Sequence, residues 1–441
     1  MGIPFYFATL AKRHAGITSI VKKNSRINVD VLAIDFNCLI HRYLKDGQPI
    51  QSILDALEHI VTEICHGKQL YIAMDGVVPY AKIVQQRYRR FRIRTDVSAG
   101  FDRHQISPGT PYMKELEQGI RARFPTCVMS STLEEGEGEH KMFSWIGSLP
   151  ESERKSVCVY GLDADLILLA LSRCELSQTN QMWLLRESGE FDDPKLKEAE
   201  FAILSVWKLK TVLPISIEQY IPLCVLCFGN DFMPNLAMFS LREDGYDRAL
   251  SIYSKCGSPN MTTTEGRNIF LKSAALEEMN VLRDRIQRRK QPLEKTILGK
   301  DGALFSQKYG IHVLDGVSDM YPVVVAFWRT FHWTLDYFQT NMTNNWAWVY
   351  PYPDAPLISD IIEYPESNAV LPCSKSFDIG EQLRFILPAK SLRSAKRRVV
   401  YHDELHSETR HPWMKRHDWE MKPRISLPWN PTGELTTVSP L

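Results

Sequence analysis

The residues best suited to chemistry are carboxylates that alternate with glycine. In EEGEGEHK, residues 134–141, one glycine separates Glu137 from Glu139 and another precedes them. Glycine is unfavourable inside a helix, so we expect an extended or helix-entry segment in which alternate side chains point the same way. Both carboxylates could then reach one cation. The segment predicts a metal site, although EGEGE alone would also fit a solvated loop.

Further acids stand where apolar runs end. VDVLAIDF, LYIAMD and SVCVYGLDAD each run into carboxylates, and GNDF follows the apolar run 217–228; these acids are Asp35, Asp75, Asp163, Asp165 and Asp231. A single Asp in such a place is more often a turn or helix-capping residue. Because several occur in succession, we predict that they form one cluster with Glu137 and Glu139.

Seven crowded carboxylates repel one another strongly unless cations neutralise them. Hard oxygen ligands suit Mg²⁺ or Mn²⁺. Two such ions, held about 3.5 to 4 Å apart, would activate water and stabilise the leaving oxygen of a phosphodiester. The acids therefore predict metal-dependent phosphodiester hydrolysis.

The elements that must position these acids are typical of an α/β fold. Residues 29–36, 70–75 and 156–165 read as buried strands, and helical segments such as 53–65 supply the crossovers. In a mostly parallel sheet flanked by helices, ligands bind beyond the carboxyl ends of the strands. The strand ends should therefore bring the acids to one edge.

A basic segment follows Asp75 in DGVVPYAKIVQQRYRRFRIR. Pro79 suits a helix start, and four polar residues share one face of the predicted helix, at Lys82, Gln86, Arg89 and Arg90. A glutamine amide beside three cations suits a terminal phosphate. Residues 82–94 hold six Lys or Arg and no acid. We therefore favour phosphate binding over an ordinary solvated basic helix.

Composition excludes several classes of protein. The 441 residues include 53 Lys and Arg against 52 Asp and Glu, so any preference for a polyanion must come from local clusters. We expect neither membrane insertion nor secretion, because no run of eighteen apolar residues and no signal-peptide pattern occurs. The nine scattered cysteines predict reduced thiols inside the cell, in the cytoplasm with the nucleus not excluded.

Two further patterns could bind zinc, and for both we favour a structural role. Cys224 and Cys227 form a CxxC inside the apolar run IPLCVLCF, where core packing is favoured over a zinc or redox role. His402 and His406 in HDELH could share a helix face, but the Glu is misplaced for a zinc-protease motif.

These motifs together resemble the XRN family of 5′→3′ exoribonucleases. MGIPFYF, DFNCLIH, DGVVPYAKIVQQRYRRFR, ISPGTPYM, EGEGEHK, YGLDADLILLAL and GNDFMP occur in the family's order. FHWTLDYF and WAWVYPYPDAPLISD are similar to the family's second region. We accordingly expect a nuclease domain at 1–285, a short basic linker at 286–311, and a second, aromatic- and Pro-rich region at 312–441 that packs on the first.

The resemblance implies a core related to flap endonucleases and PIN-like nucleases. It also implies a processive, two-metal enzyme that removes 5′-mononucleotides from single-stranded RNA carrying a 5′-monophosphate. In this reading the seven acids hold magnesium, and Lys82, Gln86, Arg89 and Arg90 form the 5′-phosphate pocket. His41 and Trp333 would stack the terminal base between them.

Two substitutions depart from the family pattern, and two rival functions stay open. Glu135 replaces a usual proline, and Tyr80 stands where an arginine is usual. The long insertion that separates the two regions in the family is shortened in this chain. Processivity therefore does not follow from the resemblance alone. The rivals are a flap-type, structure-specific DNA endonuclease with the same metal cluster and a catalytically weak RNA-binding scaffold. The sequence names no protein partner.

Overall fold

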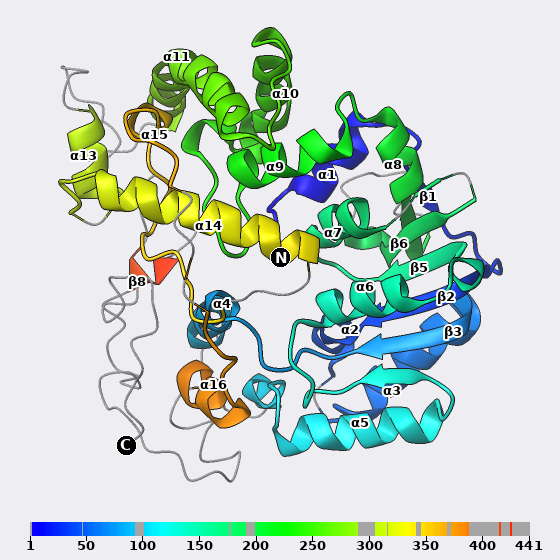
Figure 1. Cartoon of the computed structure of the whole chain (residues 1–441). Coiled ribbons are helices and arrows are strands. Elements are labelled where there is room, and N and C mark those ends of the chain that lie inside the picture. Colours follow the sequence, from blue (N-terminus) through cyan, green and yellow to red (C-terminus); the bar gives the residue numbers. More distant parts are fainter. Residues whose placement is uncertain are drawn as a thin grey trace. The chain divides into compact units, whose positions relative to one another are not determined.

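The structure is a computed structural model of the chain. It describes residues 2–45, 47–92, 101–174, 176–177, 179–190, 199–289, 305–314, 316–340, 345–367, 371, 373–387, 414–415 and 424–425. The chain divides into two compact units (Figure 1). Unit 1 comprises Met1–Pro214, Phe338–Asn341 and Lys375–His402, and unit 2 comprises Ile215–Tyr337, Met342–Ser374 and Asp403–Leu441.

Unit 1 is built on a seven-stranded sheet with the order β1-β7-β6-β5-β2-β3-β4. Its strands are β1 (Thr18–Ile20), β2 (Ile27–Asp35), β3 (Cys65–Ala73), β4 (Val128–Ser130), β5 (Ser156–Tyr160), β6 (Gln181–Glu187) and β7 (Phe201–Ser205). The five strands from β6 to β4 are mutually parallel, and β7 and β1 pair antiparallel at one edge. The expected α/β fold with a mostly parallel sheet is confirmed.

Helices cover both faces of the sheet, and alternate residues of each central strand face opposite sides. The central strands are therefore apolar at consecutive positions. Leu32 and Ile34 of β2 share a core with α2 (Phe36–Tyr43), α3 (Gln51–His59) and α5 (Pro111–Arg123). On the other face, α6 (Gly138–Ser148) packs on β2 and β3, while α7 (Asp165–Arg173) packs on β6. There Tyr71 of β3 stacks on Trp145 of α6 with ring centroids 4.5 Å apart. Figure 1 shows α3 and α5 on one side of the strands and α6 and α7 on the other.

Two further helices of unit 1 matter for function. Helix α4 (Tyr80–Arg92) begins directly after Pro79, whose carbonyl accepts hydrogen bonds from the next turn, as predicted for this proline. Helix α16 (Ile379–Ile386) lies about three hundred residues later in the chain, yet it packs on α4. Among its described residues, the unit has two more α-helices, α1 (Tyr6–Arg13) and α8 (Val206–Val212).

Unit 2 is mostly helical in the part that the structure describes, with one small antiparallel sheet of β8 (Met414–Lys415) and β9 (Arg424–Ile425). It contains α9 (Ile217–Phe228), α10 (Gly245–Lys255), α11 (Thr264–Arg289), α13 (Phe305–His312), α15 (Ile358–Ile361) and most of α14 (Tyr321–Thr340). Cys224 and Cys227 are fully buried in α9, which confirms their expected role in core packing. None of the nine cysteines, all of which are described, forms a disulfide.

The predicted domain boundaries at 285 and 312 stay a prediction. Helix α11 continues to Arg289 and α13 begins at Phe305, so both ends of the predicted linker 286–311 are helical. His402 and His406 lie outside the described residues. Within the described part, no single helix is long and apolar enough to cross a membrane, whereas the bent pair α8 and α9 passes that test together.

A buried carboxylate joins two elements of unit 2 and makes stability depend on pH. Glu278 of α11 accepts hydrogen bonds from the backbone N–H groups of Ile358 and Ser359 at the start of α15, at 2.8 and 3.0 Å. Burial raises its pKa to about 7, and these two hydrogen bonds oppose the rise. Between its unfolded pKa and about 7, the folded state therefore binds more protons than the unfolded state.

We expect the free energy of unfolding to lose up to about 3 kcal/mol from this group as pH rises through that window. Glu278→Gln removes the titration, while its amide nitrogen would face one of the two N–H donors, so the variant is less stable at pH 5. The gap to the wild type should narrow toward pH 8, measured by urea unfolding. A gap that is independent of pH would contradict this assignment.

Candidate metal centre and phosphate-binding helix

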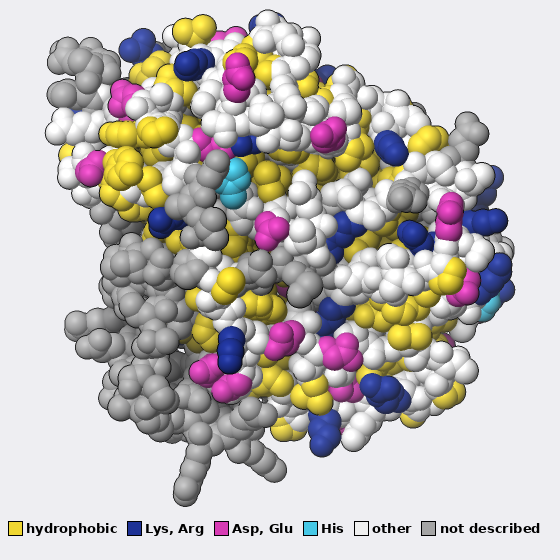
Figure 2. All heavy atoms as spheres, in the orientation of Figure 1, with side chains coloured by type: hydrophobic (Ala, Val, Ile, Leu, Met, Phe, Trp, Pro, Cys, Tyr) yellow, Lys and Arg dark blue, Asp and Glu magenta, His cyan; other side chains and the backbone are white. Residues whose placement is uncertain are grey.

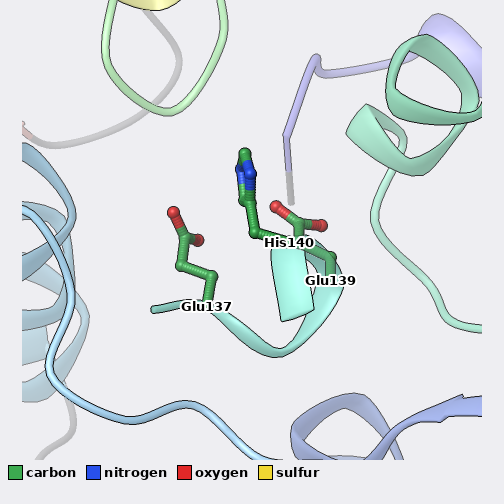
Figure 3. Close-up of side chains that lie close together, drawn as sticks. All are labelled: Glu137, Glu139 and His140. Carbon is green, nitrogen blue, oxygen red and sulfur yellow. The ribbon is translucent and has the colours of Figure 1, made fainter. Parts of the chain in front are cut away.

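The EGEGE segment enters α6 as expected. Glu137 is extended and Glu139 lies in the first helical turn, and both side chains are buried (Figure 3). Gly136 has a φ of 105°, a conformation that favours glycine. The N–H of Gly138 donates to Asp75 Oδ1 at 2.8 Å, and a Cβ on Gly138 would come within 3.3 Å of the Ala73 carbonyl. The glycines therefore let the segment approach the end of β3 closely.

The other acids of unit 1 reach the same place from the strand ends. Asp35 ends β2, pairs in register with Ala73 of β3, and caps α2. Asp165 begins α7 and accepts a hydrogen bond from the Ile3 N–H at 3.0 Å, while Asp163 lies in the turn after β5. The parallel register thus brings the carboxyl ends of β2, β3 and β5 to one edge, as predicted.

Mutual repulsion and burial perturb the carboxylates. Burial and, to a smaller extent, the charge of Asp75 raise the pKa of Asp35 to about 6, against hydrogen bonds from Cys38 and the charge of Lys82. Burial also raises the pKa of Glu139 well above its ordinary value. The charge of Glu137 adds to this effect, and Lys82 opposes it. These groups act on one another electrostatically, so they form a cluster.

The donor set fits a hard divalent cation. Glu139 Oε2 is buried and has no hydrogen-bond partner among the described residues. Carboxylate oxygens of Glu137 and Glu139 lie within 4.8 Å of each other, close enough to hold one ion between them. Buried, mutually repelling oxygens are the donors that Mg²⁺ and Mn²⁺ prefer. The cluster can therefore hold a divalent cation.

Lys82 of α4 connects this cluster to the basic helix. Its ammonium lies 2.5 Å from Glu137 Oε2, and both side chains are less than a tenth exposed. Gln86 lies one helical turn further along α4 and is half-buried. Arg89 and Arg90 continue the helix, but their side chains lie outside the described residues. The structure thus places the first cation of the predicted phosphate pocket directly against the acids.

The positive charge of α4 is local. Over the described part of the face shown in Figure 2, acidic and basic side chains are interspersed, in keeping with a net charge of +1. Arg87 of α4 contacts α16: its guanidinium donates to the carbonyl of Phe385 and lies over the ring of that residue.

The structure describes three further predicted site residues without testing their predicted roles. Asp231 and Trp333 belong to unit 2, whereas His41 lies exposed on α2 of unit 1. Trp333 is buried, donates from Nε1 to the Asn345 carbonyl at 2.9 Å, and meets the ring of Phe232 edge-on at 5.2 Å. Metal binding by Asp231 and base stacking between His41 and Trp333 stay predictions.

Comparison with known protein families identifies both regions of the chain. The model of the XRN 5′-3′ exonuclease N-terminus matches residues 1–99 and 94–188, and that of the Xrn1 helical domain matches residues 284–398. The chain belongs to the XRN family. The motifs that suggested this resemblance include the acids and the basic helix described above.

Curated members of the XRN family are similar along much of the chain. Human 5′-3′ exoribonuclease 1 is 25% identical over 89% of this chain and 31% of its own length. The Saccharomyces cerevisiae exoribonuclease 1 is 26% identical over 58% of this chain and 21% of its own length. The exoribonuclease 2 of Debaryomyces hansenii is 28% identical over 58% and 35%. This XRN chain thus spans about a third or less of these relatives.

Solved structures of nucleases show a more distant likeness. The catalytic core of Rad2 in complex with DNA substrate has a TM-score of 0.39 and 13% identity, over 80% of this chain and 91% of that one. The bacteriophage T5 flap endonuclease in a product complex with DNA and metal ions has a TM-score of 0.32 and 11% identity, over 52% and 75%.

The sequence did not single out three polar side chains that support the site of this XRN chain. Arg173 donates to His140 Nδ1 at 2.9 Å, so the proton of a neutral imidazole is on Nε2 and neither nitrogen offers a lone pair to a cation. Lys141 is buried and donates to the carbonyls of Met74 and Ser131, which ties the ends of β3 and β4 together. Their burial depends on tertiary contacts, so no local pattern marks them.

Proposed function

We propose that this chain is a processive 5′→3′ exoribonuclease. Its substrate would be single-stranded RNA with a 5′-monophosphate, its products 5′-mononucleotides, and its cofactors two Mg²⁺ or Mn²⁺ ions. Membership of the XRN family supports the class of activity, and the named relatives are 5′-3′ exoribonucleases. Its location would be the cytoplasm, as the nine scattered cysteines predict.

The ion pair between Lys82 and Glu137 carries the proposal. It puts the first cation of α4 against the acid cluster, so a terminal phosphate bound to α4 would lie next to the metal ligands. Bound divalent ions would polarise a phosphodiester and supply the attacking water. The carboxylates of Asp35, Glu137 and Glu139 would hold those ions. Cleavage one nucleotide from the bound end then follows from the short separation of the two sites.

The same arrangement favours a monophosphate at the 5′ end. Lys82 and the Gln86 amide can donate to phosphate oxygens, whereas a 5′-hydroxyl offers these donors no anion to bind. A triphosphate or cap is too bulky for donors placed around one phosphate. The chain should therefore prefer monophosphorylated ends.

The test is hydrolysis of uniformly labelled single-stranded RNA with magnesium, comparing 5′-monophosphate, 5′-hydroxyl and 5′-triphosphate ends. We expect mononucleotides, released fastest from the monophosphate. Equal rates on all three ends would contradict the phosphate pocket. Short oligonucleotides cut from a DNA flap would instead favour the endonuclease, and tight RNA binding without turnover would favour the scaffold.

A further inference from the structure

Helix α16 belongs to the part of the chain matched by the Xrn1 helical domain, yet it contacts the phosphate-binding helix of unit 1. It begins with a capping box in which Asp378 and Glu381 satisfy each other's backbone N–H groups. Its residue Phe385 meets the ring of Tyr80 edge-on at 5.3 Å, and Phe377 lies 6.0 Å from the same ring. Tyr80, where the family usually has arginine, therefore serves as a docking residue for α16.

A buried glutamine lies between Phe377 and Phe385 in the sequence. Gln382 is 1% exposed, and its side-chain amide lies between the start of α4 and Gln86. The N–H of Val78 donates to Gln382 Oε1 at 3.1 Å, and Gln382 Nε2 donates to Gln86 Oε1 at 3.3 Å. The two hydrogen bonds connect the backbone of Val78, through the Gln382 amide, to Gln86 of α4, and we call them the amide relay.

The direction of this relay is fixed by chemistry. A backbone N–H can only donate, so the atom of Gln382 that faces Val78 must be its carbonyl oxygen. The amide nitrogen then faces Gln86 and requires an acceptor there, which must be Gln86 Oε1. Gln86 Nε2 therefore points away from Gln382 with its two N–H donors, and no described residue accepts from it.

We propose that Gln382 is a positioning residue that orients the Gln86 amide so that its N–H donors face the 5′-phosphate. This inference rests on the proposed function. Phosphate oxygens only accept hydrogen bonds, so an amide presented by its nitrogen attracts them and one presented by its oxygen repels them. Gln382 thus decides whether Gln86 favours or opposes a monophosphate end.

Gln382→Glu tests this by inverting the relay. The carboxylate still accepts from the Val78 N–H, but its second oxygen now faces Gln86 and needs a donor there. Gln86 must turn its nitrogen toward residue 382 and its oxygen toward the phosphate. We expect kcat/KM on 5′-monophosphate RNA to fall roughly tenfold to a hundredfold, and the rate on 5′-hydroxyl RNA to change little.

A double-mutant cycle separates orientation from simple repulsion by the new charge. In a Gln86→Met background, Gln382→Glu should no longer change the preference for the monophosphate. Persistence of the full loss in that background would overturn the proposal. Asp378→Ala is the matched control on α16, because it weakens the capping box without changing the amide relay.

Asp378→Ala should lower the melting temperature and keep the end preference. An equal loss of preference in Asp378→Ala would assign the effect to helix docking and overturn the role of the amide. The wild-type assay separates the proposed function from the proposed role of Gln382. A wild type without end preference refutes the proposed function, whereas a normal wild type with an unaffected Gln382→Glu variant refutes only this inference.

Discussion

Glu139→Gln is expected to reduce metal-dependent RNA hydrolysis roughly a thousandfold or more, because a lost cation removes several kcal/mol of transition-state stabilisation. Gln is nearly isosteric with Glu, so the change removes charge without opening a cavity. Divalent-cation affinity, measured by calorimetric titration of the full chain, should fall together with turnover.

The same substitution should make the protein more stable when no divalent ion is added. Burial and the charge of Glu137 raise the pKa of Glu139, which means that its ionised form is unfavourable in the folded state. Removing that charge relieves the repulsion, so the melting temperature should rise while activity is lost. This opposition between stability and activity is typical of functional sites.

The matched control for Glu139→Gln is Asp55→Asn. It removes one carboxylate charge from an exposed position on α3, where Asp55 accepts from Arg123 at 2.7 Å. We expect unchanged turnover and unchanged cation affinity. Full activity and normal cation binding in Glu139→Gln would exclude Glu139 as a metal ligand.

Glu366→Ala is expected to lower the free energy of unfolding by about 3 to 5 kcal/mol, because it leaves the buried Arg267 without its anionic partner. Arg267 of α11 donates to Glu366 from Nε at 3.0 Å and from Nη2 at 2.5 Å. The two side chains are 4% and 0% exposed. Burial alone would raise the pKa of Glu366, but hydrogen bonds from His332 and Arg267 outweigh it and lower the pKa.

Chemical unfolding monitored by tryptophan fluorescence measures this cost, since Trp328 and Trp333 lie on α14 of the same unit. Glu366→Gln keeps an acceptor for Arg267 and should cost less than the alanine variant. Glu363→Ala, an exposed acid three residues earlier, should have little effect. An unchanged unfolding midpoint in Glu366→Ala would show that the pair does not stabilise unit 2.

The sheet and much of the acid cluster could be predicted from the sequence because both follow local rules. Within VDVLAID, residues 31–34 are apolar at consecutive positions, which suits a strand covered on both faces, and β2 is such a strand. Parallel strands end at one edge of their sheet, so Asp35 and Asp75 were expected together, and the structure brings them together. The helix entry at Glu137 followed from the two glycines.

Other predicted members of the site stay predictions. Asp231 was predicted from its place after an apolar run, and His41 and Trp333 were assigned by resemblance to the family. Lys82 was predicted as a phosphate ligand from its helix face alone. Its pairing with Glu137 depends on where the fold places α4 relative to the start of α6, which helical periodicity does not encode.

The sequence by itself determined the parallel sheet, the acids at its edge and the basic face of α4. Only the tertiary structure decided which polar groups hold those elements in place. Gln382 and Gln86 are 296 residues apart, and Arg267 and Glu366 are 99 apart. Helical periodicity and capping act within one element, so the sequence reveals them. Contacts between distant residues form only when their elements pack and become buried, which is why the tertiary structure decided them.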